Sequence, residues 1–531
     1  QALGIYSINR PEWLLAEFGA HRMGRYSVAL YDTLGPDAAE YILQHAGVAV
    51  VVCSIDKVPR LLKLKKRLPD LKAIVSMDSF EEHGRNPVAL PFTVNAVRVL
   101  HEWAAALGVE LLDVDDVRAM GRAEPRPPRP PRPEDLCTIC YTSGTTGQPK
   151  GVMATHASYA FSAKSNWLVM HLAEPVHMSF LPLAHCYERN GVYSGMLGGG
   201  RIGFYSGDVA NIVGDMQALR PTGFLGVPRL YNRMYDRIAA ATIYAPGLRG
   251  VLARTALRQK LERLEAGQGV HHALWDRIVC SKIRAVFGGR LEMAASGSAP
   301  LDGRVLNFLR VALAVTIREG YGTTECNALA TASVLNENTS GHVGIPSPAT
   351  DIRLRDVPEM NYRATDRPCP RGEILIRSAS TFVGYYRDPE KTREAFDGEW
   401  LATGDIGQLN PDGNLQIIDR SKNIVKLAQG EYVAVEHLEA IYSRHRLVES
   451  IFVHADSLQS TLVAVVVPDP ESFLPWAKAV TGLPHASLEE LCGNAQVVKA
   501  LLAELSKLGR EAKLQGFEIV HGIYCEPLPF D

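Results

Sequence analysis

The chain has 531 residues, of which 46% are hydrophobic and 21% charged, and its formal net charge is −2. This is the composition of an ordinary globular protein long enough for two or more domains, and the balanced charge argues against a nucleic-acid-binding surface. No apolar run reaches the roughly 18 residues that a membrane-spanning helix needs, and nine dispersed cysteines favour a reducing, intracellular compartment over a disulfide framework.

Residues 1–120 alternate short apolar runs with helical patterns, which is typical of β/α units around a parallel sheet. The apolar runs at 49–53 and 73–76 are predicted strands, and the lysine- and arginine-rich segment 57–67 is interpreted as a solvated helix face. The first residues already resemble a strand inside a domain. We therefore expect natural sequence before Gln1, which leaves room for a targeting or anchoring segment.

Residues 125–133 contain only proline and arginine and are predicted to form an extended connector; a ligand for a proline-reading domain is the alternative. The next segment, 135–141, alternates like a short buried strand and contains Cys137 and Cys140. No second cysteine pair at zinc spacing accompanies them. A buried structural pair is therefore favoured over a metal or redox site.

This strand leads into residues 141–151, Tyr-Thr-Ser-Gly-Thr-Thr-Gly-Gln-Pro-Lys-Gly. Glycines let backbone N–H groups converge on an anion, hydroxyl groups add donors, and Lys150 adds a mobile charge suited to phosphate. The string is not the common P-loop, because Pro149 precedes the lysine and Gly151 follows it. It predicts a phosphate-binding loop, with a flexible surface loop as the alternative.

The β/α rhythm resumes over 152–330 and is interrupted by a charged helical insertion at 244–284. A solvent-facing helix is the default interpretation of this insertion, and a membrane-surface helix is the alternative, so peripheral membrane association stays open. Short strands with Gly, Pro and Asp turns predict a β-rich subdomain over 341–419. Apolar runs at 450–455 and 461–467 predict two strands of a separate small domain.

Four further strings contain residues suited to nucleotide chemistry: 181–189, 318–325, 400–405 and 417–423. In the second string, glycines permit close backbone approach, an aromatic ring can stack on a base, and Glu325 is a hard oxygen ligand for Mg²⁺. In the third, Asp405 follows a tight turn, and its carboxylate can accept hydrogen bonds from two ribose hydroxyls. Each string alone has a structural explanation, and the charged residues of 181–189 would more often be satisfied structural groups.

Taken together and in this order, the strings resemble the adenylate-forming superfamily from end to end. Within it, the likeness is to the eukaryotic-type long-chain acyl-CoA synthetases, or fatty acid–CoA ligases. This finer assignment rests on four stretches: 30–35, 356–362, 397–422 and 426–436. The third departs from the family signature at Ala402, where histidine is usual, and at Ser421, where a basic residue is usual.

The resemblance implies an α/β fold in two domains. Residues 1–419 would form a large N-terminal domain of β/α sheets with a small β-rich subdomain, and residues 420–531 a small mobile α+β domain. The implied reaction uses ATP and Mg²⁺ to convert a long-chain fatty acid to acyl-AMP with release of pyrophosphate, after which coenzyme A displaces AMP. The alternatives are a fatty acyl-AMP ligase, another acid–CoA ligase, or a non-catalytic acyl- or nucleotide-binding relative.

Matched position by position, the resemblance assigns roles to individual nucleotide-binding residues. The residues that hold the β- and γ-phosphates of ATP are Thr142, Ser143, Gly144, Thr145, Thr146, Gly147 and Lys150. The residues that bracket the adenine are Gly297, Ser298, Ala299, Pro300, Glu319, Gly320, Tyr321 and Gly322. Thr324 touches the phosphate that becomes AMP, Glu325 helps to hold Mg²⁺, and Asp405 and Arg420 bind the ribose. The candidate catalytic residues are Lys150, Thr324, Glu325 and Arg420.

The remaining roles concern the acyl group, coenzyme A and domain motion. By resemblance, His185 and Arg189 line the carboxylate end of the acyl pocket, Gly430 borders the pantetheine tunnel, and Lys422 is the hinge. The family also carries a catalytic lysine after a stretch like 517–523, and Lys513 precedes that stretch and does not match it. We expect that lysine beyond Asp531.

Overall fold

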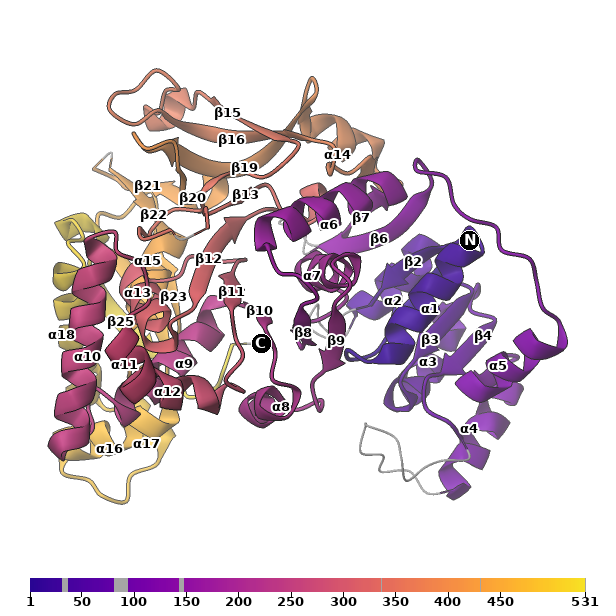
Figure 1. The fold of residues 1–531 in the computed structure, drawn as a ribbon, viewed down its shortest axis with the longest axis horizontal. Coiled ribbons are helices and arrows are strands. Elements are labelled where there is room, and N and C mark those ends of the chain that lie inside the picture. Colours follow the sequence, from indigo (N-terminus) through magenta and orange to yellow (C-terminus); the bar gives the residue numbers. More distant parts are fainter. Residues whose placement is uncertain (31–36, 81–93, 143–147, 336, 430, 531) are drawn as a thin grey trace.

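The computed structural model describes residues 1–30, 37–80, 94–142, 148–335, 337–429 and 431–530 (Figure 1). Two large mixed sheets, an antiparallel sheet and a smaller C-terminal unit make up the molecule. None of the helices within these ranges is long and apolar enough to cross a membrane.

The first sheet has eight strands in the order β17-β7-β6-β2-β1-β3-β4-β5. Strands β1 to β6 run parallel, and Val51 and Ile74 in the middle of the sheet are fully buried, as expected where helices cover both faces. The strands are β1 (Ala2–Tyr6), β2 (Tyr26–Ala29), β3 (Val50–Cys53), β4 (Ala73–Ser76), β5 (Glu110–Asp113), β6 (Leu136–Thr142), β7 (Lys150–Thr155) and β17 (Gly384–Tyr385). The accompanying helices are α1 (Pro11–Arg22), α2 (Ala38–Ala46), α3 (Val58–Leu64), α4 (Val94–Ala106) and α5 (Val114–Ala123).

The second sheet has seven strands in the order β14-β13-β12-β11-β10-β8-β9. Its parallel strands place the carboxyl ends of β11 and β12 at one edge. The strands are β8 (Val176–Ser179), β9 (Arg201–Phe204), β10 (Gly223–Gly226), β11 (Met293–Ser296), β12 (Thr316–Tyr321), β13 (Thr331–Ala332) and β14 (Ile345–Pro346). The helices are α8 (Ile212–Leu219), α9 (Pro228–Ala241), α10 (Gly247–Glu265), α11 (Ala273–Trp275), α12 (Ser281–Val286) and α13 (Gly303–Leu313), and α10 to α12 are the predicted insertion.

Helices α6 (His156–Met170) and α7 (Cys186–Leu197) lie between the two large sheets (Figure 1). Helix α6 begins with a capping box, in which the side chains of Thr155 and Ser158 accept hydrogen bonds from each other's backbone N–H groups. Helix α7 begins after His185, whose Nδ1 accepts a hydrogen bond from the N–H of Tyr187 at 3.1 Å. These caps fix where both helices start relative to the strand ends.

An antiparallel sheet covers one end of the two large sheets (Figure 1). Its core contains Ile374, Ile376 and Leu401, and the period of two between the isoleucines turns both toward the same interior. The strands are β15 (Thr350–Arg355), β16 (Arg371–Ser378), β18 (Phe396–Asp397), β19 (Trp400–Leu409) and β20 (Leu415–Arg420), with α14 (Pro389–Glu394) beside them. This part is the predicted β-rich subdomain.

The C-terminal part has its own hydrophobic core. Helix α18 contributes Val497, Leu501 and Leu505 at four-residue spacing, so one face is buried while charged residues occupy the other. The strands are β21 (Ile424–Lys426), β22 (Tyr432–Ala434), β23 (Val448–His454), β24 (Leu462–Pro468) and β25 (Val520–Cys525). The helices are α15 (Val435–Tyr442), α16 (Pro470–Thr481), α17 (Leu488–Cys492) and α18 (Ala495–Glu511).

The predicted α/β fold class is confirmed by these sheets. The proline- and arginine-rich segment 125–133 is extended and almost wholly exposed, and the N–H of Arg129 donates to the carbonyl of Arg22 at 2.9 Å. The predicted boundary between 419 and 420 stays a prediction. Of the stretch 30–35, residues 31–35 lie outside the described residues.

Candidate active site

Strands β6 and β7, which flank the predicted phosphate loop, form an antiparallel pair. Thr142, the last residue of β6, pairs with Lys150, the first residue of β7. A Cβ atom on Gly151 would lie 2.9 Å from a methyl carbon of Ile139, so the start of β7 has room only for glycine there. Five of the predicted phosphate-binding residues lie outside the described part of the chain: Ser143, Gly144, Thr145, Thr146 and Gly147.

Tyr385 connects this strand pair to Glu325. Strand β17 pairs with β7, which places Tyr385 opposite Val152. The Nζ atom of Lys150 lies 4.9 Å from the centroid of the Tyr385 ring, and the Tyr385 hydroxyl donates to Oε1 of Glu325 at 2.8 Å. Among the described residues, Oε2 of Glu325 has no hydrogen-bond partner, so this oxygen can serve a cation.

Thr324 meets the first residue of α7. Thr324 and Glu325 lie in a short 3₁₀ turn (Thr324–Cys326) that follows β12. The thiol of Cys186 donates to Oγ1 of Thr324 at 3.7 Å. His185 precedes this cysteine, and burial, reinforced by the charge of Arg189, lowers the pKa of the imidazole below its usual value. The imidazole is therefore uncharged at neutral pH.

The predicted adenine-binding residues follow two adjacent parallel strands. Gly297 and Ser298 come directly after β11, and Ser298 has a left-handed backbone with φ of 73°. Strand β12 ends in the predicted Glu319, Gly320 and Tyr321. Because Ser296 pairs with Glu319, both segments emerge at the same edge of the sheet, as they must to enclose one base.

Two close approaches explain glycines at this edge. A Cβ atom on Gly297 would lie 3.3 Å from the ring of Tyr187, and one on Gly322 would lie 2.2 Å from the carbonyl oxygen of Ala328. Ala299 and Pro300 continue the exposed loop after Ser298. Burial raises the pKa of the Glu319 carboxyl to about 7, against the opposing effect of Arg310.

The predicted ribose-binding residues are brought together by a strand pair. Asp405 on β19 pairs with Arg420 on β20, and Nε of Arg420 lies 3.8 Å from Oδ1 of Asp405. The hydroxyl of Tyr321 donates to Oδ2 of the same carboxylate at 2.5 Å. Burial raises the pKa of Asp405, and the hydrogen bond from Tyr321 opposes this rise. A predicted adenine-binding residue, Tyr321, thus contacts a predicted ribose-binding residue, Asp405.

Arg189 of α7 lies in the protein interior. Its side chain is 1% exposed, and its guanidinium donates to the carbonyl oxygens of Leu183 and Ala184 at 2.9 and 3.2 Å. It also donates to Oγ1 of Thr138 at 2.7 Å and to Oε1 of Glu17 at 3.2 Å. These contacts join α1, β6 and α7 in the interior, and the position of Arg189 at the carboxylate end of the acyl pocket stays a prediction.

The predicted hinge, Lys422, is exposed in the 3₁₀ turn (Ser421–Asn423) between β20 and β21. Beyond it, ion pairs join the C-terminal part to helices α9 and α13: Arg444 contacts Asp302, the N-cap residue of α13, and Nη2 of Arg229 on α9 lies 2.8 Å from Oε1 of Glu449. Gly430 lies outside the described residues.

A cavity runs alongside α7. It is small, about 20 Å³, and is lined by Trp167 of α6, Gly191 and Gly195 of α7, and His177 and Leu225 of neighbouring strands. A Cβ atom on Gly195 would lie 3.2 Å from Ile202. Gly195 therefore lets α7 pack closely against β9. Neither this cavity nor Tyr385 was predicted from the sequence, because the position of Tyr385 depends on the pairing of β17 with β7.

Comparison with known proteins identifies the family. The family described as AMP-binding enzyme matches residues 1–386. The peroxisomal long chain acyl-CoA synthetase 7 of Arabidopsis thaliana is 43% identical over 530 residues, which cover 99% of this chain and 73% of that protein. The long-chain-fatty-acid–CoA ligase 1 of Homo sapiens is 41% identical over 539 residues, covering 99% and 74%.

Solved structures show the same fold. The adenylation domain of a carboxylate reductase from Mycobacterium chelonae superposes with a TM-score of 0.82 at 29% identity, covering all of this chain and 76% of that one. The corresponding domain from Segniliparus rugosus, in complex with AMP and a co-purified carboxylic acid, gives 0.78 at 27% identity, covering all of this chain and 78% of that one. The chain therefore belongs to the AMP-binding enzymes and, among them, to the long-chain acyl-CoA synthetases, which are acid–thiol ligases.

Proposed function

We propose that this enzyme activates a long-chain fatty acid with ATP to acyl-AMP, releases pyrophosphate, and transfers the acyl group to coenzyme A. The observation that carries the proposal is the convergence of two contact groups. Lys150, Tyr385 and Glu325 form one, and Tyr321, Asp405 and Arg420 form the other. Because Glu325 follows Tyr321 by four residues, the two groups lie close together, as the phosphates and the ribose of one nucleotide require.

The first group suits the triphosphate. Attack of a carboxylate on the α-phosphorus accumulates negative charge, which positive charges and hydrogen-bond donors must offset. Lys150 is held by the Tyr385 ring, and no carboxylate of the described residues forms an ion pair with it, so its ammonium can move to a phosphate oxygen. Glu325 presents the kind of oxygen that Mg²⁺ prefers, and Mg²⁺ bound there would neutralise phosphate charge. Tyr385 would orient that carboxylate.

The second group suits the nucleoside. The carboxylate of Asp405 can accept hydrogen bonds from two ribose hydroxyls, with Arg420 beside it. The backbone edges at Gly297 and Gly320 provide flat walls for the adenine, and the ring of Tyr321 provides a stacking surface. Tyr321 already bonds to Asp405, so base and ribose recognition depend on each other.

We propose that the acyl chain runs alongside α7, in the direction of the small cavity. The N-terminal end of this helix carries Cys186, which contacts Thr324, and Gly191 and Gly195 follow along the helix toward the cavity. A carboxylate near Thr324 would thus have its hydrocarbon chain directed along α7. Coenzyme A would then attack the acyl-AMP after the C-terminal part rotates about Lys422, and the thiol sulfur would displace AMP from the acyl carbon.

The proposal is tested by separating the two half-reactions. The purified protein is given ATP, Mg²⁺ and palmitate, and pyrophosphate is measured; coenzyme A is then added and the thioester is identified by mass. Pyrophosphate and palmitoyl-CoA are the expected products. Pyrophosphate without thioester would indicate a fatty acyl-AMP ligase, preference for benzoate over palmitate would indicate another acid–CoA ligase, and the absence of both products would refute the proposed activity.

A further inference from the structure

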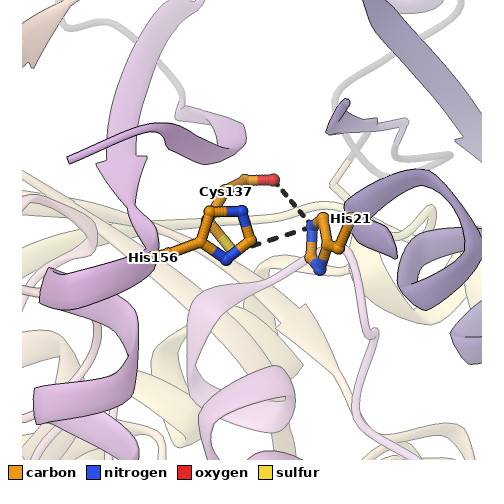
Figure 2. A group of neighbouring side chains, drawn as sticks. All are labelled: His21, Cys137 and His156. Atoms are coloured by element: carbon orange, nitrogen blue, oxygen red, sulfur yellow. Dashed lines mark hydrogen bonds between the residues drawn. The ribbon is translucent and has the colours of Figure 1, made fainter. Parts of the chain in front are cut away.

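Three potential metal ligands meet at the end of β6 opposite the phosphate loop (Figure 2). They are His21 in the last turn of α1, Cys137 near the start of β6, and His156, the first residue of α6. One ligand atom from each lies within 4.8 Å of the others. Cys137 and Thr142 are five residues apart on one strand, so the cluster lies about 17 Å from the phosphate end of β6.

The local contacts leave this cluster incompletely satisfied. Nε2 of His21 lies 2.9 Å from the carbonyl oxygen of Cys137 and 3.7 Å from its Sγ atom. The rings of His21 and His156 meet edge to face with centroids 4.8 Å apart. Nε2 of His156 is buried and has no hydrogen-bond partner among the described residues. Such a nitrogen indicates a missing partner, because a buried polar atom without one is costly.

We propose that His21, Cys137 and His156 bind a thiophilic divalent cation of the zinc type. Two imidazoles and one thiolate are ligands that Zn²⁺ prefers, whereas Mg²⁺ and Ca²⁺ prefer oxygen. Binding breaks the S–H bond of Cys137, releases its proton to solvent and forms a metal–sulfur bond without any change of oxidation state. Three protein ligands leave a fourth position for water.

The position of the site gives the ion a mechanical role. Cys137 lies on β6, and His156 directly follows β7, so the ion would join both strands of the β6–β7 pair at their far ends. His21 would attach the same pair to α1. Ion binding is therefore expected to stabilise the sheet that positions Lys150, without contacting the nucleotide.

Cys140 provides a matched control. It lies three residues from Cys137 on the same strand and is also buried, but its thiol donates to the carbonyl oxygen of Ala184 at 3.3 Å. The two cysteines of the CxxC string therefore face opposite sides of β6 and do not form a chelating pair. Replacing either by serine alters a buried thiol to a similar extent, whereas only Cys137 belongs to the proposed site.

The test uses the full chain freed of metal by chelation. Co²⁺ serves as a spectroscopic substitute for Zn²⁺, because a cobalt–thiolate bond gives a charge-transfer absorption that histidine and water ligands do not give. The parent and the Cys140→Ser variant are expected to show this absorption, to retain one equivalent of Zn²⁺ after gel filtration, and to melt at higher temperature with Zn²⁺. Cys137→Ser should lose the absorption, and His156→Gln should weaken Zn²⁺ binding by more than about 100-fold, since even outer partners of zinc ligands contribute 10–100-fold.

Equal Zn²⁺ affinity in the parent and His156→Gln would overturn the proposal. So would the absence of a cobalt–thiolate absorption in the parent, or its persistence in Cys137→Ser. His156 is only partly buried at the first position of α6, so glutamine there should preserve the fold and allow a result even where the cysteine variant does not fold. The chain has 16 histidines, and adventitious ions on them would bind equally to all four proteins.

Discussion

Arg189 offers the sharpest test of how the interior is built. Replacing it with methionine keeps a long apolar stem but removes every guanidinium contact, including the ion pair with Glu17. Both side chains are at most 1% exposed, so the carboxylate would remain buried without its positive partner. Breaking a buried pair in this way costs about 3–5 kcal/mol, mainly because one charge is left uncompensated.

The remaining contacts of Glu17 determine how much of the lost stability a second substitution, at Glu17, can recover. Its carboxylate still accepts hydrogen bonds from the hydroxyls of Ser27, at 2.6 Å, and Tyr193. The double variant Glu17→Gln, Arg189→Met removes the orphaned charge, keeps one oxygen to accept from one of these hydroxyls, and presents its amide NH₂ as a donor to the other hydroxyl oxygen. We expect it to recover about 2 kcal/mol of the loss, because replacing both members of a buried pair is far less costly than removing one.

Urea unfolding followed by tryptophan fluorescence measures both effects, because the ring of Trp13 is fully buried 5.2 Å from the Arg189 guanidinium. The single variant should unfold at lower urea concentration, and the double variant between it and the parent. Kinetics on the folded fraction should leave the KM for palmitate nearly unchanged. An unchanged unfolding midpoint with a raised KM for palmitate would refute the structural role of Arg189 and support its role at the acyl carboxylate.

Lys150→Ala and Glu325→Ala should each abolish most pyrophosphate release without changing the melting temperature, since neither side chain fills a core position; release at the parental rate would remove the residue from the phosphate site. Tyr385→Phe should weaken activation by Mg²⁺ about tenfold, because a hydrogen bond to a charged group contributes about 1.5 kcal/mol; an unchanged Mg²⁺ requirement would show that Glu325 is oriented otherwise. The pKa of Glu319 is raised to about 7 in the folded state, so this state binds the extra proton and stability falls as pH rises from about 4.5 to 7. Glu319→Gln should flatten this decline in urea unfolding, and an equal pH slope in both proteins would contradict it. Gly195→Leu should obstruct the path proposed for the acyl chain along α7 and shift kcat/KM from palmitate toward shorter acids; an unaltered preference would show that the acyl chain lies elsewhere.

The elements predicted correctly from the sequence are those that a local pattern of apolar residues determines. Alternating apolar runs and helical patterns gave the parallel strands β3 and β4 to within a residue, because burial on both faces requires such runs. The strings containing Tyr321, Asp405 and Arg420 also met in space as expected of one nucleotide site. The spacing of these residues in the chain does not show that they lie close together. Their proximity follows from the pairing of β19 with β20 and from the hydrogen bond that Tyr321 of β12 donates to Asp405.

What the sequence could not reveal depends on contacts between distant segments. Arg189 and His185 occur in one string, yet the helix turns Arg189 into the interior toward Glu17, which is 172 residues away. Tyr385 gained its role only because a two-residue strand pairs with β7. Likewise, the CxxC string gave no sign that its members face opposite sides, or that two histidines from other elements lie beside Cys137.

The ion pairs at the C-terminal part make its orientation sensitive to salt. Arg229 is 67% exposed and would be screened within a Debye length of about 8 Å at physiological ionic strength, whereas Asp302, the partner of Arg444, is only 6% exposed and is screened less. The two ion pairs therefore differ in salt sensitivity: added salt weakens the Arg229–Glu449 pair first and leaves the Arg444–Asp302 pair formed. If the C-terminal part rotates about Lys422 as proposed, ionic strength changes how long the enzyme stays in this orientation before coenzyme A attacks the acyl-AMP. This effect is separate from any effect of salt on nucleotide affinity.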